Sequence, residues 1–399
     1  MQKIFKTAIV GGGAAGLMSA VELLNGNNAL SGTEVIVLER NDRVGKKLIA
    51  TGNGQGNLTN LNMSEEFFYG DKNFIREFLR LLNDINLMEY LENLGIPLVS
   101  SKDGKIYPLS KQASSVLDII RAFLDYKNCV VKTDFIVTEV VKRKGVFLVK
   151  SSGEEILAEK VIIATGGSVA KQFGTDGSAY AIMERLGHEK SKIYPSLVQL
   201  KTDTSKIRSL KGLKETVLVS AYSGVNKIKS ASGEILFTEF GVSGSAIFQV
   251  SVGIADKINA KLIVEFLPEK SEKEIADILS KRKQTPYIKN EDLLSGMLNK
   301  RVGQAVLKTA KSMDVKDIVY AIKNFTLEVS GTLGFNYAQV TRGGIKTDKI
   351  DPKTMQSKII DGIYIVGETL DVDGDCGGYN LTFAFTSGII AARAIKNKL

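Results

Sequence analysis

Thr7-Ala-Ile-Val-Gly-Gly-Gly-Ala-Ala-Gly16 is the stretch that decides the fold. Its apolar start predicts a short buried strand, and the residues from Ala14 onward predict a helix. Between them, Gly11, Gly13 and Gly16 give the spacing G-x-G-x-x-G. In that motif the first glycine permits a tight turn, the second leaves room for a pyrophosphate, and the third lets helix and strand pack closely. Because free N–H groups at a helix start attract negative charge, we interpret the stretch as a phosphate cradle for a dinucleotide.

A second predicted strand, over 34–38, ends in Glu39. The carboxylate of Glu39 is placed to accept hydrogen bonds from an adenosine ribose. The alternative is a glycine-rich turn that binds no ligand. A strand, three glycines, a helix, a second strand and a terminal acid in this order favour the dinucleotide, because a glycine triplet alone is a weak signal.

The net charge of the chain is +9, which raises the question of a nucleic-acid or membrane partner. Lys and Arg are spread along the chain and interleaved with acids, so we expect a solvated basic surface and no nucleic-acid partner. No stretch is long and apolar enough to span a membrane. The N-terminal apolar run superficially resembles a signal peptide, but Gly11 interrupts it. We therefore expect a cytoplasmic protein without a membrane partner.

Cysteine and histidine usage excludes several kinds of active site. The two cysteines, Cys129 and Cys376, form no C-x-x-C pair, which fits a reducing compartment and argues against a redox dithiol or a zinc site. His188 is the only histidine, so a histidine-based metal site or a Ser-His-Asp triad is close to excluded. We predict no metal site, assign no catalytic residue and interpret His188 as structural. For Cys376, the role of a small residue in a turn is favoured over that of a thiolate.

A β-meander is predicted between residues 130 and 157, beginning with one long strand over 130–141. The strand that follows ends in Ala164-Thr-Gly-Gly167. That sharp turn is expected to send the backbone back against the cradle.

Between residues 194 and 266 the pattern is mostly β, with a turn predicted at Gly233 between two short strands. A small barrel or sandwich is the natural interpretation. Residues 268–324 show apolar residues at helical spacing, which is typical of the core faces of a small helical subdomain.

The C-terminal part of the chain again pairs glycines with a helix start. A strand predicted over 359–366 precedes Gly367-Glu368, and Gly377-Gly378 precedes a final helix from about Leu381 to Lys396. The N–H groups and the dipole of that helix favour negative charge. Reduced flavin carries such charge at its N1–C2=O edge, so FAD is a better candidate than NAD, and one extended ligand would join the two ends of the chain.

We therefore predict an α/β protein with a discontinuous Rossmann-like FAD-binding domain, an inserted β-barrel or sandwich domain and a small helical subdomain. The FAD-binding domain is expected over 1–190 and 341–399. The inserted β-rich domain, a cap for the substrate, is expected over 191–267 and 325–340. The helical subdomain is expected over 268–324.

Five motifs, in order along the whole chain, carry a resemblance to a known family. They are Ile9-Val-Gly-Gly-Gly-Ala-Ala-Gly16, Gly45-Lys-Lys-Leu48 with Asn57-Leu-Thr-Asn60, Ala164-Thr-Gly-Gly167, Phe240-Gly-Val-Ser-Gly244, and Gly367-Glu-Thr-Leu-Asp-Val-Asp-Gly374 with Gly377-Gly-Tyr-Asn-Leu381. The chain resembles flavoproteins with two dinucleotide-binding-type halves. Among these it is similar to the aminoacetone-oxidase-like group of FAD-dependent oxidoreductases, which includes bile-acid dehydro-reductase-like members.

The resemblance implies a set of cofactor-binding residues. The pyrophosphate would be held by Gly11, Gly13, Ala14, Ala15 and Gly16, backed by Ala164, Thr165 and Gly166. Glu39 and Arg40 would surround the adenosine ribose, and the backbone of Val137 would meet adenine. The residues along the flavin and its ribityl chain would be Lys47, Leu48, Gly52, Asn57, Leu58, Gly367, Glu368, Gly378, Tyr379, Asn380 and Leu381.

The sequence departs from the usual pattern of that group at three places. Asn53-Gly-Gln-Gly56 stands where Gly-Gly-Arg-Cys is usual, Glu239 where a His is common, and Ser245 where a Pro is common. These departures lie near the presumed active cavity. They bear on the substrate more than on FAD binding.

Our main functional hypothesis is an FAD-dependent oxidoreductase that passes a hydride or electron pair through flavin N5 to or from a small organic substrate. Amine oxidation and enone reduction both fit. The alternatives are a flavin-binding regulatory or partner-binding protein without turnover, and an enzyme acting on nucleic acid, which only the positive charge suggests. NAD(P)H as the reductant is not supported by a separate motif, and the oligomeric state is left open.

Overall fold

The computed structural model describes residues 2–254 and 260–398. The chain divides into two compact units, Met1–Tyr194 with Val340–Leu399 and Pro195–Gln339. Residues 255–259, which belong to the range expected for the inserted domain, lie outside the described residues. The predicted α/β class, with a Rossmann-type parallel sheet and an inserted barrel, is confirmed.

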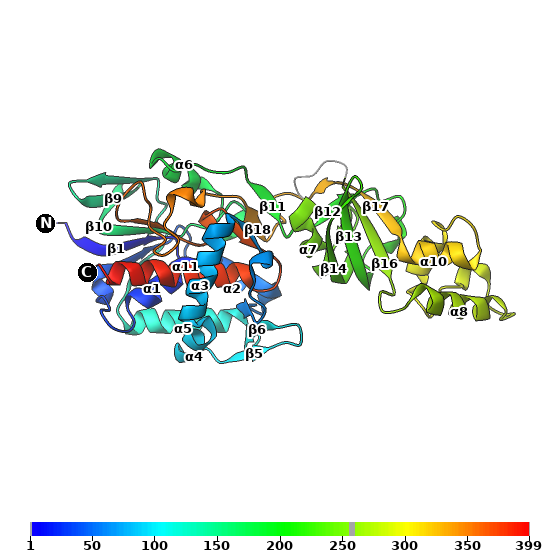
Figure 1. The fold of residues 1–399 in the computed structure, drawn as a ribbon. Helices are drawn as coiled ribbons and strands as arrows, with labels where there is room; N and C mark the ends of the chain where they lie inside the picture. Colours follow the sequence, from blue (N-terminus) through cyan, green and yellow to red (C-terminus); the bar gives the residue numbers. More distant parts are fainter. Residues whose placement is uncertain (1, 255–259, 399) are drawn as a thin grey trace. The chain divides into compact units, whose positions relative to one another are not determined.

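A seven-stranded sheet forms the centre of the first unit (Figure 1). Its strand order is β7 (Val130–Lys132), β2 (Val35–Leu38), β1 (Ile4–Val10), β10 (Glu154–Ile163), β9 (Val146–Ser151) and β8 (Glu139–Arg143), with β19 (Ile363–Ile365) also paired to β10. The pairs that join β7, β2, β1, β10 and β19 are parallel, whereas β8 and β9 are antiparallel. The carboxyl ends of the parallel strands therefore meet at one edge of the sheet.

The prediction of one long strand over 130–141 is wrong. The segment splits into β7, which joins the parallel sheet beside β2, and β8, which belongs to the antiparallel part. The break contains Asp134, whose φ is 55°. The N–H groups of Asp134 and Phe135 donate to the carbonyl oxygens of Asn41 and Glu39, so the break follows the end of β2.

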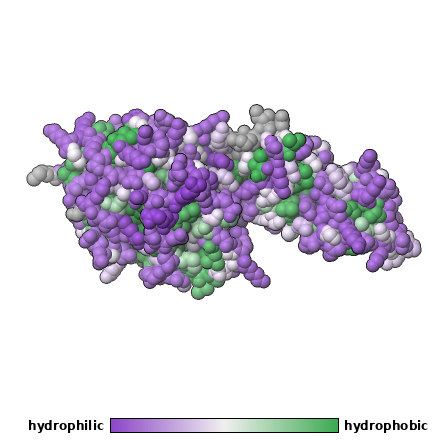
Figure 2. Space-filling view, in the orientation of Figure 1, coloured by the Kyte–Doolittle hydropathy of each residue, from purple (hydrophilic) through white to green (hydrophobic). Residues whose placement is uncertain are grey.

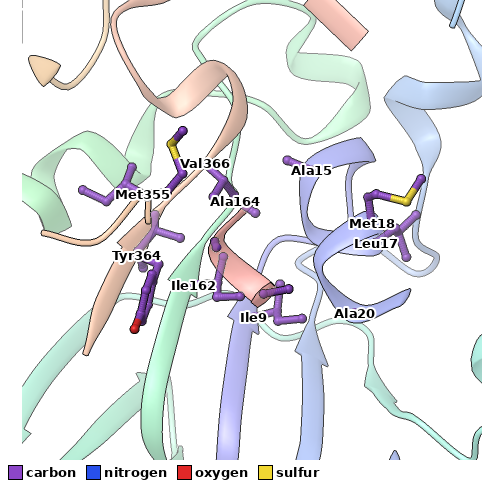
Figure 3. Close-up of a cluster of buried hydrophobic side chains, with 14 of the residues drawn as sticks. Ile9, Ala15, Leu17, Met18, Ala20, Ile162, Ala164, Met355, Tyr364 and Val366 are labelled. Atoms are coloured by element: carbon purple, nitrogen blue, oxygen red, sulfur yellow. The ribbon is translucent and has the colours of Figure 1, made fainter. Parts of the chain in front are cut away.

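Helices α1 (Ala14–Leu23) and α11 (Tyr379–Lys396) lie together beside the sheet (Figure 1). In Figure 3, Ile9 and Ile162 lie on neighbouring strands, with Ala15 and Leu17 of α1 close to them. All four are buried. Parallel strands covered on both faces are near-continuous apolar runs, which explains the composition of β1 and β2.

Smaller elements complete the first unit. A three-stranded sheet has the order β3 (Thr59–Asn60), β6 (Lys105–Pro108) and β5 (Leu98–Ser100), and β20 (Val372–Gly374) pairs with β4 (Phe68–Gly70). Further elements of this unit include α2 (Lys46–Ile49), α3 (Lys72–Ile85), α4 (Leu87–Asn93), α5 (Ala113–Tyr126), α6 (Ser178–Arg185), the short helix η8 (Gly367–Thr369) and the strand β18 (Val340–Arg342).

The described residues of the second unit form a closed barrel and four α-helices that share its hydrophobic core. The barrel order is β12 (Leu200–Thr202), β15 (Gly241–Ser243), β14 (Asn226–Phe237), β13 (Lys214–Ser223), β16 (Ala260–Phe266) and β17 (Phe325–Thr332). Helix α7 (Ser245–Ile254) packs on β13 and β14, and α8 (Glu272–Lys283), α9 (Lys300–Leu307) and α10 (Val315–Lys323) form the helical part. The strand β11 (Tyr194–Ser196) lies at the start of the insertion.

The turn predicted at Gly233 is wrong, because β14 runs through it as one strand. A Cβ at Gly233 would lie 2.6 Å from the Oγ of Ser245, at the start of α7. This glycine therefore permits a helix to approach the strand closely and does not break it.

Candidate cofactor site

The glycine turn after β1 is built by two close approaches. Gly11 has a φ of +109°, and a Cβ there would overlap the carbonyl oxygen of Ala164. A Cβ on Gly16 would overlap the carbonyl oxygen of Gly11. The N–H of Ala164 donates to the carbonyl oxygen of Val10 at 2.8 Å, so the end of β10 lies against the turn, as the sequence predicts.

Gly13 differs from both neighbouring glycines of the motif. Its backbone is extended, with φ −85° and ψ −168°, and any residue can adopt that conformation. A Cβ built on Gly13 has no described atom within 4 Å. Gly13 is the N-cap of α1 and has no side chain to cap the helix. The open space beside the helix start is therefore a place where a phosphate group would fit.

Glu39 is buried beside this turn, and its carboxylate is held in a fixed orientation. One oxygen, Oε2, accepts from the N–H of Gly12 at 2.8 Å. The other, Oε1, accepts from the backbone N–H of Asn41 at 2.9 Å and from its Nδ2 at 2.7 Å. A carboxylate offers about four acceptor positions, so one remains for a hydroxyl donor.

Arg40 is engaged by a loop that the sequence analysis did not connect to it. Its guanidinium contacts the carboxylate of Asp176 at 2.6 Å and donates to the carbonyl oxygen of Gly174 at 3.2 Å. Burial alone would raise the pKa of Asp176, but hydrogen bonds from Arg40 and Ser178 outweigh it and lower the pKa to about 2. The pair fixes the segment between Gly166 and α6 to the end of β2.

We expect Asp176→Asn to lower the free energy of unfolding by about 1 kcal/mol at neutral pH, after allowance for solvent screening of the pair. A carboxyl whose pKa falls from 3.8 to about 2 on folding stabilises the native state above pH 3.8 and loses this contribution as the pH falls through 2. Urea unfolding of wild type and variant from pH 7 to pH 2 measures the difference. A difference that stays constant down to pH 2 would contradict the assignment.

Val137 lies in the break between β7 and β8. Within the part of the chain that the structure describes, its backbone N–H and C=O make no hydrogen bond. The nearby N–H of Phe135 donates to the carbonyl oxygen of Glu39 at 2.9 Å, which brings this segment to the end of β2. The backbone of Val137 is thus available for polar contacts such as those of a purine edge.

Lys47 and Glu368 come together from distant parts of the chain. The ammonium of Lys47 contacts Oε2 of Glu368 at 2.6 Å, and the N–H of Thr341 donates to Oε1 at 2.8 Å. Leu48, the next residue of α2, is buried in the core. The two charges compensate each other, so Lys47 does not present a free ammonium.

The N-terminus of α11 is attached to the segment before β3. Gly378 has a φ of +99°, and a Cβ there would overlap the carbonyl oxygen of Thr59. With the Asn57 amide oriented to satisfy its neighbours, its Oδ1 accepts from the N–H of Gly378 at 3.1 Å. The hydroxyl of Thr382 donates to that of Thr59 at 2.8 Å. The N-cap residue Gly378 has no side chain to cap the following N–H groups.

The side chains of Tyr379 and Asn380 both contact residues that neighbour the start of α11. The ring of Tyr379 stacks on Phe67 with centroids 4.8 Å apart. The Asn380 amide accepts from the N–H of Gly374 and donates to its carbonyl oxygen, both at 2.8 Å. Any ligand contact of these two residues would therefore use the backbone.

Helices α1 and α11 cross closely, and Gly367 also lies beside the start of α1. A Cβ on Gly388 of α11 would lie 2.5 Å from the carbonyl oxygen of Ala15, and one on Gly367 would lie 2.9 Å from the Cβ of Ala15. The remaining predicted residues have the following environments: Gly52 has a φ of +57°, Leu58 is buried, the hydroxyl of Thr165 lies 3.3 Å from that of Thr369, the carbonyl oxygen of Gly166 accepts from Thr369, and Leu381 is half-buried.

The sequence analysis missed a polar cluster beside the loop before α11. The hydroxyl of Tyr69 donates to Oδ1 of Asp375 at 2.9 Å, and the guanidinium of Arg342 lies 4.7 Å from the centre of the Tyr69 ring. The signal was the alternation of acids in Asp371-Val-Asp-Gly-Asp375, which spans β20 and the residue on either side of it.

Cys376 and His188 do not show the properties of reactive groups. Burial raises the pKa of Cys376, against the opposing effect of Lys105, so the residue is a neutral thiol. Burial lowers the pKa of His188, and its Nε2 lies 2.9 Å from the hydroxyl of Ser357. Among the described residues, no group of three or more His, Cys, Asp or Glu side chains is arranged to hold a metal ion.

Three comparisons agree with this architecture. Residues 5–394 match the family model described as HI0933-like protein Rossmann domain. The chain is 33% identical over 98% of its length, and 98% of the relative's, to a 3-dehydro-bile acid delta(4,6)-reductase of Clostridium scindens. It is 26% identical, over the full length of both chains, to a ribosomal RNA dihydrouridine synthase of Haemophilus influenzae.

Among solved structures, a 3-ketosteroid-delta4-(5alpha)-dehydrogenase of Rhodococcus jostii matches with a TM-score of 0.53. The match covers 99% of this chain and 98% of that one, at 15% identity. At that identity the match speaks for the fold alone. The family resemblance inferred from the sequence motifs is confirmed. No helix among residues 2–254 and 260–398 is long and apolar enough to cross a membrane.

Proposed function

Because the chain belongs to the HI0933-like Rossmann-domain family, we propose that it is an FAD-dependent oxidoreductase that reduces a carbon–carbon double bond conjugated to a carbonyl group. The observation that carries the proposal is the 33% identity, along nearly the whole of both chains, to a reductase named for such a substrate. Amine oxidation, which the sequence also admitted, has no counterpart among the relatives described above.

The names of the two relatives describe one kind of chemistry. A 3-dehydro-bile acid with double bonds at positions 4 and 6 is an extended enone, and the uracil ring of uridine has a double bond conjugated to its C4 carbonyl. In the uracil ring and at the 4,5 double bond of the bile acid, the carbon β to the carbonyl accepts a hydride and the α carbon accepts a proton. At the 6,7 double bond, the δ carbon accepts the hydride and the γ carbon accepts the proton. Two electrons and two hydrogens thus convert the double bond to a single bond.

The structural features described above support FAD as the cofactor, and when reduced it supplies the hydride. In this proposal, the space beside Gly13 and the start of α1 would hold the pyrophosphate. Glu39 keeps one acceptor position for the adenosine ribose, and Val137 offers its backbone to adenine. The uncapped start of α11 stabilises negative charge at the far end of the ligand.

A small organic enone is the first substrate candidate, and uridine in RNA is the second. The observation that favours the second is the distribution of charge. Residues 195–339 carry 21 Lys and Arg against 15 Asp and Glu, whereas the rest of the chain carries 32 against 29. A basic insertion is the electrostatic feature that a polyanionic substrate requires.

The experiment is an anaerobic reaction of the reduced holoenzyme with three compounds. A 4-en-3-one steroid and a uridine-containing RNA oligonucleotide test the two substrates, and the 3-oxo steroid that lacks the double bond is the matched control. We expect one of the first two to reoxidise the flavin at least about 100-fold faster than the control, with a product heavier by two hydrogens. A flavin that stays reduced with both compounds, and is reoxidised only when air is admitted afterwards, would instead support a flavin-binding protein without turnover.

A further inference from the structure

The excess positive charge of the second unit is concentrated in two short segments. Residues 281–289 and 308–316 together contain seven Lys and Arg and a single acid, Asp314. The other residues of the unit carry 14 cations and 14 anions, so they are neutral as a group. The net charge of the insertion is therefore the charge of these two segments.

The two segments lie together at one end of the helical part (Figure 1). Residues 281–289 are the end of α8 and the loop after it, and residues 308–316 join α9 to α10. The ammonium of Lys283 donates to the carbonyl oxygen of Met313. Ile288 and Met313 pack against the hydrophobic core, which fixes both loops to the helices.

Six lysines project from this end, and we call them the lysine face: Lys281, Lys283, Lys289, Lys308, Lys311 and Lys316. All six are exposed, and among the described residues none of them forms an ion pair with a carboxylate. The nearby Lys300, by contrast, is paired with Asp292 at 3.0 Å. Mutual repulsion of six unpaired ammonium groups costs stability, and a bound polyanion would remove that cost.

An unpacked aromatic side chain stands among the lysines. Tyr287 is 86% exposed, although its neighbour Ile288 packs on the core. The surface over α8 and α10 is otherwise mostly hydrophilic, with only a small hydrophobic area (Figure 2). Insertion into a membrane requires a broad apolar face, whereas exposed aromatic rings interleaved with cations suit stacking on bases beside a phosphate backbone.

We propose that the lysine face and Tyr287 bind single-stranded nucleic acid, with phosphates on the ammonium groups and a base on the tyrosine ring. RNA is tested first because it is the second substrate candidate above. The proposal does not rest on the redox reaction, because binding is measured without turnover. It differs from the expectation from the sequence of a solvated basic surface without a nucleic-acid partner.

The test is fluorescence anisotropy of a labelled 20-nucleotide oligo-U with the purified holoprotein, at salt concentrations from 50 to 200 mM. We expect a dissociation constant of about 1–100 µM at the lowest salt and a steep loss of affinity as salt rises. The triple variant Lys283→Glu, Lys289→Glu, Lys311→Glu should bind at least about 30-fold more weakly, and its salt slope should be smaller by about 2. Tyr287→Ala should weaken binding by about 10-fold.

The matched control is Lys102→Glu, Lys144→Glu, Lys349→Glu, which reverses three exposed lysines of the first unit and changes the net charge equally. It should keep near wild-type affinity. An equal loss in the control would overturn the proposal, since net charge alone would then explain binding. So would binding to anionic vesicles, or to an acidic peptide, without binding to oligo-U. Oligo-dT and duplex RNA distinguish the kind of strand, and a Lys→Gln version of the triple variant replaces it if the Glu version fails to fold.

Discussion

Gly13→Val should give a folded protein that no longer retains FAD. The conformation of Gly13 is accessible to valine, and its Cβ would meet no described atom within 4 Å, so the substitution strains nothing in the chain. The added methyl groups instead occupy the space beside the start of α1 that we assign to the pyrophosphate. We expect the dissociation constant for FAD to rise by at least about 100-fold, or roughly 3 kcal/mol.

The measurement is flavin absorbance per protein after purification, followed by titration of the apoprotein with FAD. Gly13→Ala, with one methyl group, should lie between wild type and valine. Gly16→Val is the contrasting variant: its Cβ would overlap the carbonyl oxygen of Gly11, so it should lose the fold together with the flavin. A Gly13→Val protein with stoichiometric FAD and unchanged affinity would show that the cradle is misassigned.

The cradle could be predicted from the sequence because its geometry is local. The strand, the glycines and the first turn of α1 follow each other directly, and the close approach of Gly16 to the carbonyl oxygen of Gly11 lies within that short stretch. That the two ends of the chain converge was also predictable, because the sequence has a second glycine-rich helix start near its C-terminus. One extended ligand, FAD, explains both helix starts.

Contacts between residues distant in the sequence could not be predicted in the same way. Nothing local to Arg40 indicates that its partner is Asp176, and Lys47 carries no signal for Glu368. Gly233 led to a wrong prediction for a related reason. The sequence predicts a turn there, but the glycine lies inside β14, where α7 approaches the strand closely. In each case the decisive neighbour comes from another element.

The distribution of charge along the whole chain did not reveal the local excess of lysine in the insertion. Along the whole chain cations and anions alternate, which is why a solvated surface was expected. In the structure, the packing of α8 on α10 and the contact of Lys283 with Met313 bring 281–289 and 308–316 together, so their lysines lie at one end of the helical part. A local cluster in space can arise from two ordinary stretches of sequence.

Gly388→Val should remove both the flavin and a large part of the stability of the first unit. In the sequence, Gly388 is only a glycine inside a helix, where it is expected to cost about 1 kcal/mol relative to alanine. The structure gives the reason for it: a Cβ would lie 2.5 Å from the carbonyl oxygen of Ala15 and 2.9 Å from the hydroxyl of Ser19. Valine must therefore push α11 away from α1.

Helix α1 begins at the glycine turn after β1, and α11 begins after Gly377-Gly378. A change in the separation of the two helices would therefore move the two parts of the proposed site apart. We expect the free energy of unfolding to fall by about 3 kcal/mol, at the upper end for overpacked cores, and FAD to be absent after purification. Ala394→Val, at a half-buried position of the same helix, controls for the lower helix propensity of valine and should keep the flavin. Urea unfolding combined with flavin content distinguishes Gly13→Val from Gly388→Val. Gly13→Val should lose only the flavin, whereas Gly388→Val should lose both the flavin and stability. A Gly388→Val protein of wild-type stability that retains FAD would mean that the two helix starts do not depend on this crossing.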